Sequence, residues 1–259
     1  MKNPPAYSFL GITVNALTRD DLSTLVESAV GENGKYTIGY HNLHSLYIYH
    51  HDPVFRNFYE RADYVHVDGM PLVWAGKLLG YPLKRENRLT SIDFLGPVLA
   101  KCSAKNLRIF FLGARPGVAE KAAMRLAADT PDLQVKTHHG YFDATPGSTE
   151  NEQVLRTINT YRPHVLLVGM GMPRQERWIL ENVDRLNANT VWSLGAFMDY
   201  FAGVTPTPPR WTGGLGLEWL YRFLSEPRRL WKRYLLEPPF VLLLLVYELT
   251  RRGPRAAGR

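Results

Sequence analysis

An aspartate directly after an apolar run is the first residue of this sequence that could do chemistry. Asp68 follows the run 65–67 and precedes Gly69, a pattern typical of the carboxyl end of a strand. Ligands of open α/β sheets bind at that edge, where partial burial makes a carboxylate a usable general base. The same Asp-Gly pair could instead be a turn former or the N-cap of the next helix. Position alone leaves both interpretations open.

A second loop, residues 168–176, has two glycines and then a row of polar residues at the start of an expected helix. The glycines would let the backbone approach a diphosphate, and the helix N-terminus offers free N–H groups. A dinucleotide-binding fingerprint requires a third glycine where this chain has Arg174, so the pattern disfavours an NAD-dependent oxidoreductase. A plain strand–helix turn is the alternative. We expect substrate contacts from Gly169, Gly171, Pro173, Arg174, Gln175 and Glu176.

Two further loops carry cations that could meet a phosphate. Gly113 and Arg115 lie in a glycine turn, with Pro116 near the first position of the next helix. Phosphate or sugar contact and plain helix initiation are both open for this turn. Arg88 lies in the loop 86–90 and could pair with a phosphate, although a lone loop arginine is usually solvated.

Several classes of catalytic and metal site have no motif in this sequence. It has no Gly-x-Ser-x-Gly elbow, no His-Glu-x-x-His pair, no lysine after a glycine-rich phosphate loop and no Asp-x-Asp motif. Cys102 is the single cysteine, which excludes an internal disulfide framework and a multi-cysteine zinc site. We therefore expect neither a bound metal nor another cofactor. Residues 1–10 lack an apolar core of signal-peptide length, so we expect a cytoplasmic protein.

The elements that would position these loops follow from alternating sequence patterns. Short apolar runs, glycine turns and stretches of helical spacing alternate through the first 200 residues, which is typical of an α/β protein with a parallel sheet. The sequence predicts a doubly wound, mostly parallel Rossmann-like domain over residues 1–203. Expected strands are 36–39, 64–67, 108–112, 134–137, 164–168 and 190–194. Expected helices are 43–60, 70–79, 92–104, 117–128 and 175–183.

The net charge of +7 belongs to the C-terminal segment, residues 204–259. This segment holds ten Lys and Arg against four acidic residues, whereas residues 1–203 hold 21 against 20. A nearly neutral body disfavours nucleic acid as a partner. We therefore expect a catalytic domain, 1–203, followed by a helical basic appendage, 204–259.

The appendage also has the composition of a membrane-surface anchor. It interleaves arginines with six Trp or Tyr residues beside the apolar run 240–247, which is too short to span a bilayer. Such a segment suits the surface of an anionic membrane. A helix docked on the body, or an interface in a homo-oligomer, is the alternative. Arg210, Arg222, Arg228 and Arg229 are the cations expected at the membrane or at a lipid-linked diphosphate.

Taken in order, these blocks resemble the WecG/TagA/CpsF family of bacterial glycosyltransferases. The resemblance covers nearly the whole chain, and its most specific parts are the blocks 171–176 and 218–222. Other matching blocks are 42–45, 67–69, 88–93, 113–119, 140–142, 195–199 and 226–229.

The resemblance implies an inverting, metal-independent enzyme that moves a sugar from a UDP-sugar to a polyprenyl-diphosphate-linked sugar in the assembly of a cell-surface polysaccharide or teichoic acid. It assigns the general base to Asp68 and functional roles to Arg88 and Gln175, with a C-terminal appendage that meets the inner face of the cell membrane. Asp93 and Asp199 are the fallback bases. Further substrate contacts are expected from Asn42, Thr90 and Asp93.

Two departures from the family pattern concern the donor sugar. Tyr40 stands where members often have threonine, and Leu89 and Ser91 replace valine and glycine. N-acetylmannosamine and a hexose such as glucose are therefore both expected donors. A nucleotide-binding regulatory module on the same fold is the main alternative function.

Overall fold

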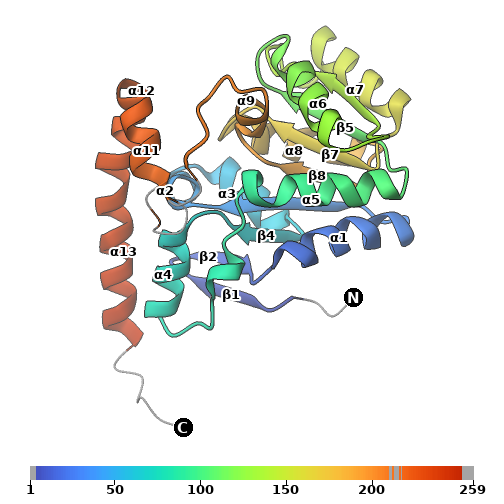
Figure 1. Cartoon of the computed structure of the whole chain (residues 1–259). Coiled ribbons are helices and arrows are strands. Elements are labelled where there is room, and N and C mark those ends of the chain that lie inside the picture. Colours follow the sequence, from blue (N-terminus) through green and yellow to red (C-terminus); the bar gives the residue numbers. More distant parts are fainter. Residues whose placement is uncertain (1–3, 210–211, 213–215, 217, 253–259) are drawn as a thin grey trace.

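The computed structural model describes residues 4–209, 212, 216 and 218–252, and its centre is a six-stranded parallel sheet (Figure 1). The strand order is β4-β3-β8-β7-β5-β6. The strands are β3 (Tyr36–His41), β4 (Tyr64–Val67), β5 (Ile109–Gly113), β6 (Val135–His138), β7 (Val165–Gly169) and β8 (Thr190–Ser193). The expected Rossmann-like α/β fold is confirmed, and each expected strand is present.

Each face of the sheet carries its own apolar cluster because successive strand residues point to opposite sides. In β5, Ile109 and Phe111 lie in one cluster, whereas Phe110 and Leu112 lie in the other. The first cluster includes side chains of α1 (Arg19–Gly31), α5 (Ser91–Ala104), α6 (Val118–Asp129) and α9 (Phe197–Phe201). The second includes α3 (Pro53–Arg61), α7 (Thr149–Tyr161) and α8 (Arg174–Asn182).

A third apolar cluster joins the two ends of the chain. It contains the antiparallel hairpin β1 (Ala6–Phe9) and β2 (Ile12–Asn15), together with residues of α2 (Leu43–His51), α4 (Met70–Leu78) and α13 (Glu237–Arg252). Figure 1 shows α13 running along the edge of the body beside α2, α4 and this hairpin. The C-terminal helix is therefore part of a packed layer.

The prediction of one helix over 43–60 is wrong, because the chain breaks at Asp52 into α2 and α3. Pro53 has no backbone N–H and disfavours helical geometry at the residue before it. The Asp52 side chain accepts hydrogen bonds from the N–H groups of Val54 and Phe55 and so caps α3. The break turns the chain so that α3 reaches the face of the sheet that α8 covers.

Several elements lie where the patterns predict none. The hairpin β1–β2, α1, α7 and α9 have no counterpart among the expected ranges. Helix α1 has a recognisable start, since Thr18 and Asp21 form a reciprocal capping box. The hairpin strands are only four residues long and are held by contacts with α13 and β4, which local sequence does not reveal.

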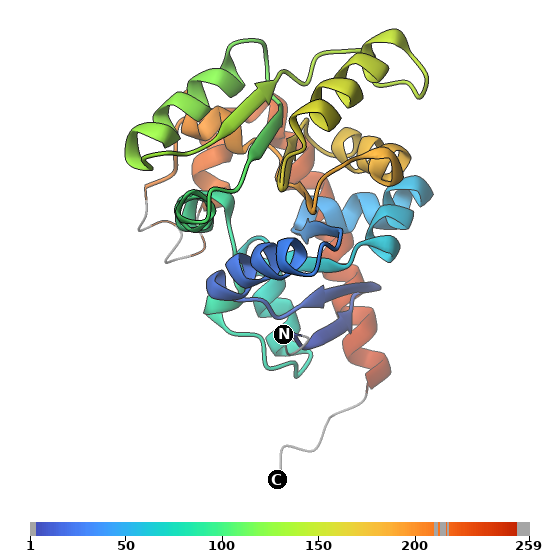
Figure 2. The ribbon, with the colours of Figure 1, turned by 90° about the vertical axis from the view of Figure 1, so that its right-hand side faces the viewer.

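The C-terminal segment folds back over the body as a series of helices (Figures 1 and 2). These are α11 (Glu218–Ser225), α12 (Pro227–Trp231), a π-helical turn (Lys232–Leu236) and α13. Phe240 of α13 packs against the rings of Tyr47, His50 and His51 on α2. No helix within the described part of the chain is long and apolar enough to span a bilayer.

The carboxyl ends of five neighbouring strands, β4, β3, β8, β7 and β5, lie along one edge of the sheet. Gly113 is paired with Gly169, Val168 with Ser193, and His41 with Val67. The residues that follow these strand ends are therefore gathered along one edge of the sheet, although they are far apart in sequence. This edge carries the polar loops considered below.

Candidate active site

Three hollows along the carboxyl edge of the sheet share residues and form one groove. The first, of about 600 Å³, lies over β4 and α4, and the second, of about 1390 Å³, lies over β3 and β8. The third, of about 1270 Å³, lies over β5 and β7. Asn42, Asp68 and Arg222 line both the first and second hollows, whereas Gly171 and Tyr200 line both the second and third. We call these the appendage end, the centre and the β5 end of the groove.

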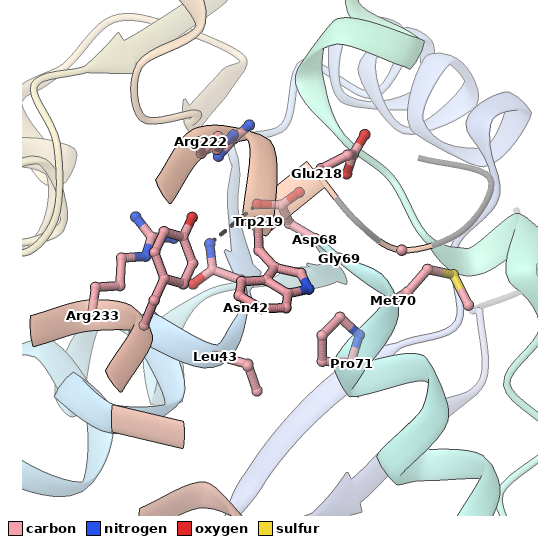
Figure 3. Close-up of a pocket in the computed structure, with 12 residues that line it drawn as sticks. Asn42, Leu43, Asp68, Gly69, Met70, Pro71, Glu218, Trp219, Arg222 and Arg233 are labelled. Carbon is pink, nitrogen blue, oxygen red and sulfur yellow. Dashed lines mark hydrogen bonds between the residues drawn. The ribbon is translucent and has the colours of Figure 1, made fainter. Parts of the chain in front are cut away.

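Asp68 lies where the appendage end meets the centre, and Asn42 faces it (Figure 3). The Asn42 Nδ2 donates to Asp68 Oδ2 at 3.1 Å. Because Asn42 Oδ1 accepts from the backbone N–H of Ser45 as the N-cap of α2, its amide nitrogen points toward Asp68. The N-cap of α4 is Gly69, with no side-chain cap. The Asp68 carboxylate is therefore free of the capping role and open to the groove.

The buried histidines near Asp68 do not compete with it as proton acceptors in the groove. His41 and His66 lie on the adjacent strands β3 and β4 and are fully buried. Burial lowers the pKa of His41 to about 3 and that of His66 to about 4, so both are neutral at physiological pH. Neither side chain lines the groove.

The appendage places cations and rings over Asp68. Arg222, Arg233, Trp219 and Tyr234 line the appendage end together with Asp68 (Figure 3). The Arg222 guanidinium lies over the Tyr200 ring at 5.0 Å, and its buried Nε has no hydrogen-bond partner. Within the part of the chain that the structure describes, no carboxylate lies in ion-pair distance of Arg222. An anion in this end of the groove would therefore meet an uncommitted guanidinium.

The β5 end of the groove is built from the two glycine loops. Gly169, Gly171, Arg115 and Arg174 line it, and Arg115 is exposed. Arg174 is the first residue of α8 and donates to the Phe142 carbonyl at 2.6 Å. Gly113 has a φ of +151° and lies so close to Gly169 that a Cβ would be 2.2 Å from the Gly169 carbonyl oxygen. Glycine is required there because the two loop backbones touch.

Gln175 and Glu176 lie beneath the groove rather than in it, since both are fully buried. Gln175 Oε1 accepts from the N–H groups of Gly171 and Gly195, at 3.2 and 3.1 Å. Its Nε2 donates to Glu176 Oε1 at 2.7 Å. The contact with Gly171 occupies one of the loop amides that the sequence pattern offers to a diphosphate.

Arg88 is committed to two carboxylates and is not a solvated loop arginine. Its side chain is 10% exposed, donates to Asp93 Oδ2 at 3.0 Å and forms an ion pair with Glu218 of α11. Thr90 also donates to Asp93. Arg88 therefore ties the appendage to α5, and it lines none of the three parts of the groove.

Comparison with known proteins agrees with this geometry. The sequence model of the family described as "Glycosyl transferase WecG/TagA/CpsF family" matches residues 7–254, which include every element of the sheet and the appendage helices through α13. The chain belongs to this family.

Curated relatives of this WecG/TagA/CpsF member include proteins from Staphylococcus aureus strains MW2, NCTC 8325 and COL. Each is 31% identical over 173 residues, and each bears the name N-acetylglucosaminyldiphosphoundecaprenol N-acetyl-beta-D-mannosaminyltransferase. The aligned segment covers 67% of this chain and 64% of the relative. The chain thus spans less than two thirds of the length of these relatives.

The remaining expected site residues of this family member are dispersed. Thr90 lines the centre of the groove and Asp199 lines its β5 end. Asp93 accepts a hydrogen bond from Arg88 and lines no part of the groove. Asp63, which is not among the expected site residues, accepts from the Thr37 N–H and has a structural role. Arg228 is exposed and lines no part of the groove. Arg210 and the Arg229 side chain lie outside what the structure describes.

Sequence reasoning missed several groove residues of the appendage and of α9. Trp219, Arg233 and Tyr234 line the appendage end, and Tyr200 lines the centre together with Tyr40. The interleaved rings and arginines of residues 217–236 were a signal for an interface, but they did not indicate which rings meet the groove. Tyr40 is 8% exposed, with its hydroxyl beneath Gly195.

Substituting Arg88→Ala is expected to lower the Tm by roughly 5–10 °C, because Asp93 and Glu218 would be left without their shared cation. A solvated loop arginine would instead leave the Tm unchanged. Differential scanning calorimetry measures the effect. Arg61→Ala on α3, whose ion pair is exposed, is the matched control and should change the Tm by less than about 2 °C. An equally stable Arg88→Ala protein would show that this bridge contributes nothing to the fold.

Proposed function

We propose that the protein is an inverting, metal-independent glycosyltransferase that moves a sugar from a UDP-sugar to an undecaprenyl-diphosphate-linked sugar. The observation that carries the proposal is the Asp68 carboxylate, which lies in the groove between cations supplied by the appendage and by the β5 end. Family membership and the names of the relatives support the same reaction class.

The reaction that fits this arrangement is a single displacement. An acceptor hydroxyl oxygen attacks the anomeric carbon, the bond from that carbon to the UDP oxygen breaks, and the hydroxyl proton passes to Asp68. One displacement inverts the anomeric centre. UDP leaves with a growing negative charge, which nearby guanidinium groups stabilise. Arg115 and Arg174 at the β5 end are the cations available for this in the described chain.

The two ends of the groove differ in a way that supports separate binding of donor and acceptor. The β5 end has two arginines, and two loop glycines that let a nucleotide diphosphate come close to the backbone. The appendage end has apolar walls from Leu43, Met70, Pro71 and Trp219 beside Arg222 and Arg233, which suits the diphosphate and first isoprene units of a lipid-linked acceptor. Asp68 lies between them and would meet the acceptor hydroxyl.

The proposed acceptor sugar is N-acetylglucosamine, after the names of the relatives. The same names support N-acetylmannosamine as donor sugar, while Tyr40 supports a hexose, since a buried phenol at the groove centre leaves less room than threonine. A donor screen separates these two sugars.

The test is transfer of radiolabel from UDP-N-acetylmannosamine, UDP-N-acetylglucosamine, UDP-glucose or UDP-galactose to a short polyprenyl-diphosphate-N-acetylglucosamine. Product that forms in the presence of a chelator, with one donor preferred, supports the proposal. No transfer from any donor, together with tight binding of UDP, would instead assign the protein to the regulatory nucleotide-binding class. Product only when a divalent cation is added would contradict metal independence.

We further propose that the appendage, residues 204–259, lies on the inner face of the cell membrane. The outward side of the last helical segments exposes six large apolar side chains, Leu235, Leu236, Leu242, Leu243, Val246 and Tyr247. Exposed basic residues border them, among them Lys232 and Arg251. The other side of α13 is packed on the body, so the helix would lie flat in the interface. An anionic cytoplasmic leaflet suits this charge.

Replacing Leu242 and Leu243 together by glutamate is expected to reduce binding to anionic vesicles at least tenfold, because two apolar contacts are lost and two charges oppose the lipid. Sedimentation with phosphatidylglycerol vesicles measures it. Binding of the parent should also weaken between 0.05 and about 0.5 M salt as the charges are screened. The control is Met124→Glu on α6, where the side chain is 67% exposed and does not belong to the apolar side of α13. Equal vesicle binding by the parent, the Leu242 and Leu243 double variant and the Met124→Glu control would contradict the proposal.

A further inference from the structure

The floor of the groove is a layer of closely packed loop backbones. A Cβ on Gly169 would lie 2.5 Å from the Gly195 carbonyl oxygen, and one on Gly195 would lie 2.6 Å from the Tyr40 hydroxyl. The loops after β7 and β8 are therefore in direct contact, with no side chain between them at this point. Their relative position decides the shape of the groove, because Gly171 and Gly195 line its centre together with Asp68.

One buried amide bridges these two loops. Gln175 Oε1 accepts from the Gly171 N–H in the β7 loop and from the Gly195 N–H in the β8 loop. A single oxygen with two lone pairs thus satisfies two backbone donors that come from different loops. Losing that oxygen would leave both N–H groups without their partner and remove the bridge.

The amide can hold the two loops only in one of its two orientations. An amide rotated by 180° has nearly the same shape but would direct its NH₂ group against the two glycine N–H groups. Glu176 stabilises the orientation that the two glycine N–H groups require, because its Oε1 accepts from Gln175 Nε2 at 2.7 Å. The carboxyl of Glu176 therefore acts on the groove without lining it.

The position of Glu176 is costly for the fold, which argues against a role in stability alone. The side chain is fully buried, and its Oε2 has no hydrogen-bond partner. Burial raises the pKa of Glu176 from 4.5 to about 8. The titratable groups that face it are the phenols of Tyr40 and Tyr59, whose pKa values burial also raises, so both stay neutral. The folded protein binds a proton that the unfolded chain lacks between these two pH values, so stability falls as the pH rises from about 4.5 to 8.

We propose that Glu176 is a positioning residue for the transfer reaction: through the side-chain amide of Gln175 it fixes the β7 loop against the β8 loop, and thereby the place of the UDP-sugar relative to Asp68. The inference rests on the proposed function. Displacing reacting groups by about 1 Å can cost roughly 10²-fold in rate. A looser contact between the β7 and β8 loops should therefore lower the rate of sugar transfer from the donor.

We call the hydrogen bonds of the Gln175 amide with Gly171, Gly195 and Glu176 the clamp. Two variants that remove the clamp and one that keeps it test the inference. Glu176→Leu removes the acceptor for Gln175, and Gln175→Met removes the amide at similar volume. Glu176→Gln keeps an acceptor oxygen of the same reach. We expect kcat/KM for the donor to fall about 10- to 100-fold in the first two and to return to within about threefold of the parent in Glu176→Gln. The KM for the acceptor should change little, because the clamp lies beneath the donor loops.

Amide hydrogen exchange provides a readout that does not depend on activity. The peptides that contain Gly171 and Gly195 should exchange at least tenfold faster in Glu176→Leu and Gln175→Met, and as slowly as in the parent in Glu176→Gln. The Tm of Glu176→Leu should stay within about 5 °C of the parent at pH 8, since removal of the buried acid offsets the lost hydrogen bond.

The possible results separate the inference from the proposed function. Unchanged exchange in Glu176→Leu would overturn the clamp. Faster exchange with an unchanged kcat/KM would overturn the positioning role, as would a loss of activity in Glu176→Leu that only follows a collapse of the Tm. A parent protein without transferase activity, whose exchange pattern nevertheless responds as described, would refute the proposed function and leave the clamp standing.

Discussion

Asp68→Asn is expected to lower kcat by roughly 10²-fold or more while the affinity for the donor changes less than about threefold. The substitution keeps the size of the side chain and keeps an oxygen that accepts from Asn42 Nδ2. It removes the basic site that would take the acceptor proton as the new glycosidic bond forms. Initial rates at saturating donor and acceptor measure kcat, and calorimetric titration with UDP measures donor-site affinity.

Asp63→Asn is the matched control for this substitution. Asp63 precedes β4, whereas Asp68 follows it, and the Asp63 side chain accepts from the Thr37 N–H, a contact that asparagine can also make. This variant should keep its turnover within about twofold of the parent. If Asp68→Asn retained near-normal turnover with both substrates saturating, Asp68 would be only a turn residue, and Asp199 in the β5 end of the groove would become the next candidate base.

Arg222→Ala is expected to lower kcat/KM for the lipid-linked acceptor by roughly 10²-fold. Arg222 faces the appendage end of the groove, lies over Tyr200 and has no carboxylate partner in the described chain. A diphosphate there would receive two charge-assisted hydrogen bonds, each worth about 1.5–3 kcal/mol. Arg222→Lys should recover only part of the loss, because an ammonium keeps the charge but not the planar fork.

The affinity for UDP distinguishes an effect of Arg222→Ala on the acceptor site alone from an effect on the whole groove. We expect it to stay within about twofold of the parent, since Arg222 does not line the β5 end of the groove. Arg156→Ala on α7 removes one exposed positive charge that lines no part of the groove and is the matched control. Equal losses in Arg222→Ala and Arg156→Ala, or a loss of UDP affinity with unchanged acceptor kinetics, would refute the assignment of Arg222 to the acceptor.

Local patterns predict the sheet because its strands are short apolar runs between turn residues. Phe110 and Phe111 in β5 pack on opposite faces, so only continuous apolar sequence fits a strand covered on both sides. Asp68 and the glycine loops could be placed at the ligand edge for the same reason, because parallel strands gather their carboxyl ends. The pattern failed at 43–60, where helical spacing continues across Asp52 and Pro53 but the backbone does not.

The sequence by itself determined the fold class, the family and the edge of the sheet at which Asp68 and the glycine loops lie. The tertiary structure decided how the distant groups pair. Arg88 meets Glu218 across 130 positions, and Gln175 reaches back to Gly171 and forward to Gly195 instead of entering the groove. Such contacts depend on how α11 folds back and how two loops pack, and local propensity contains no information on either. A polar side chain near a ligand edge can face the ligand or hold the loops, and only its burial distinguishes the two roles.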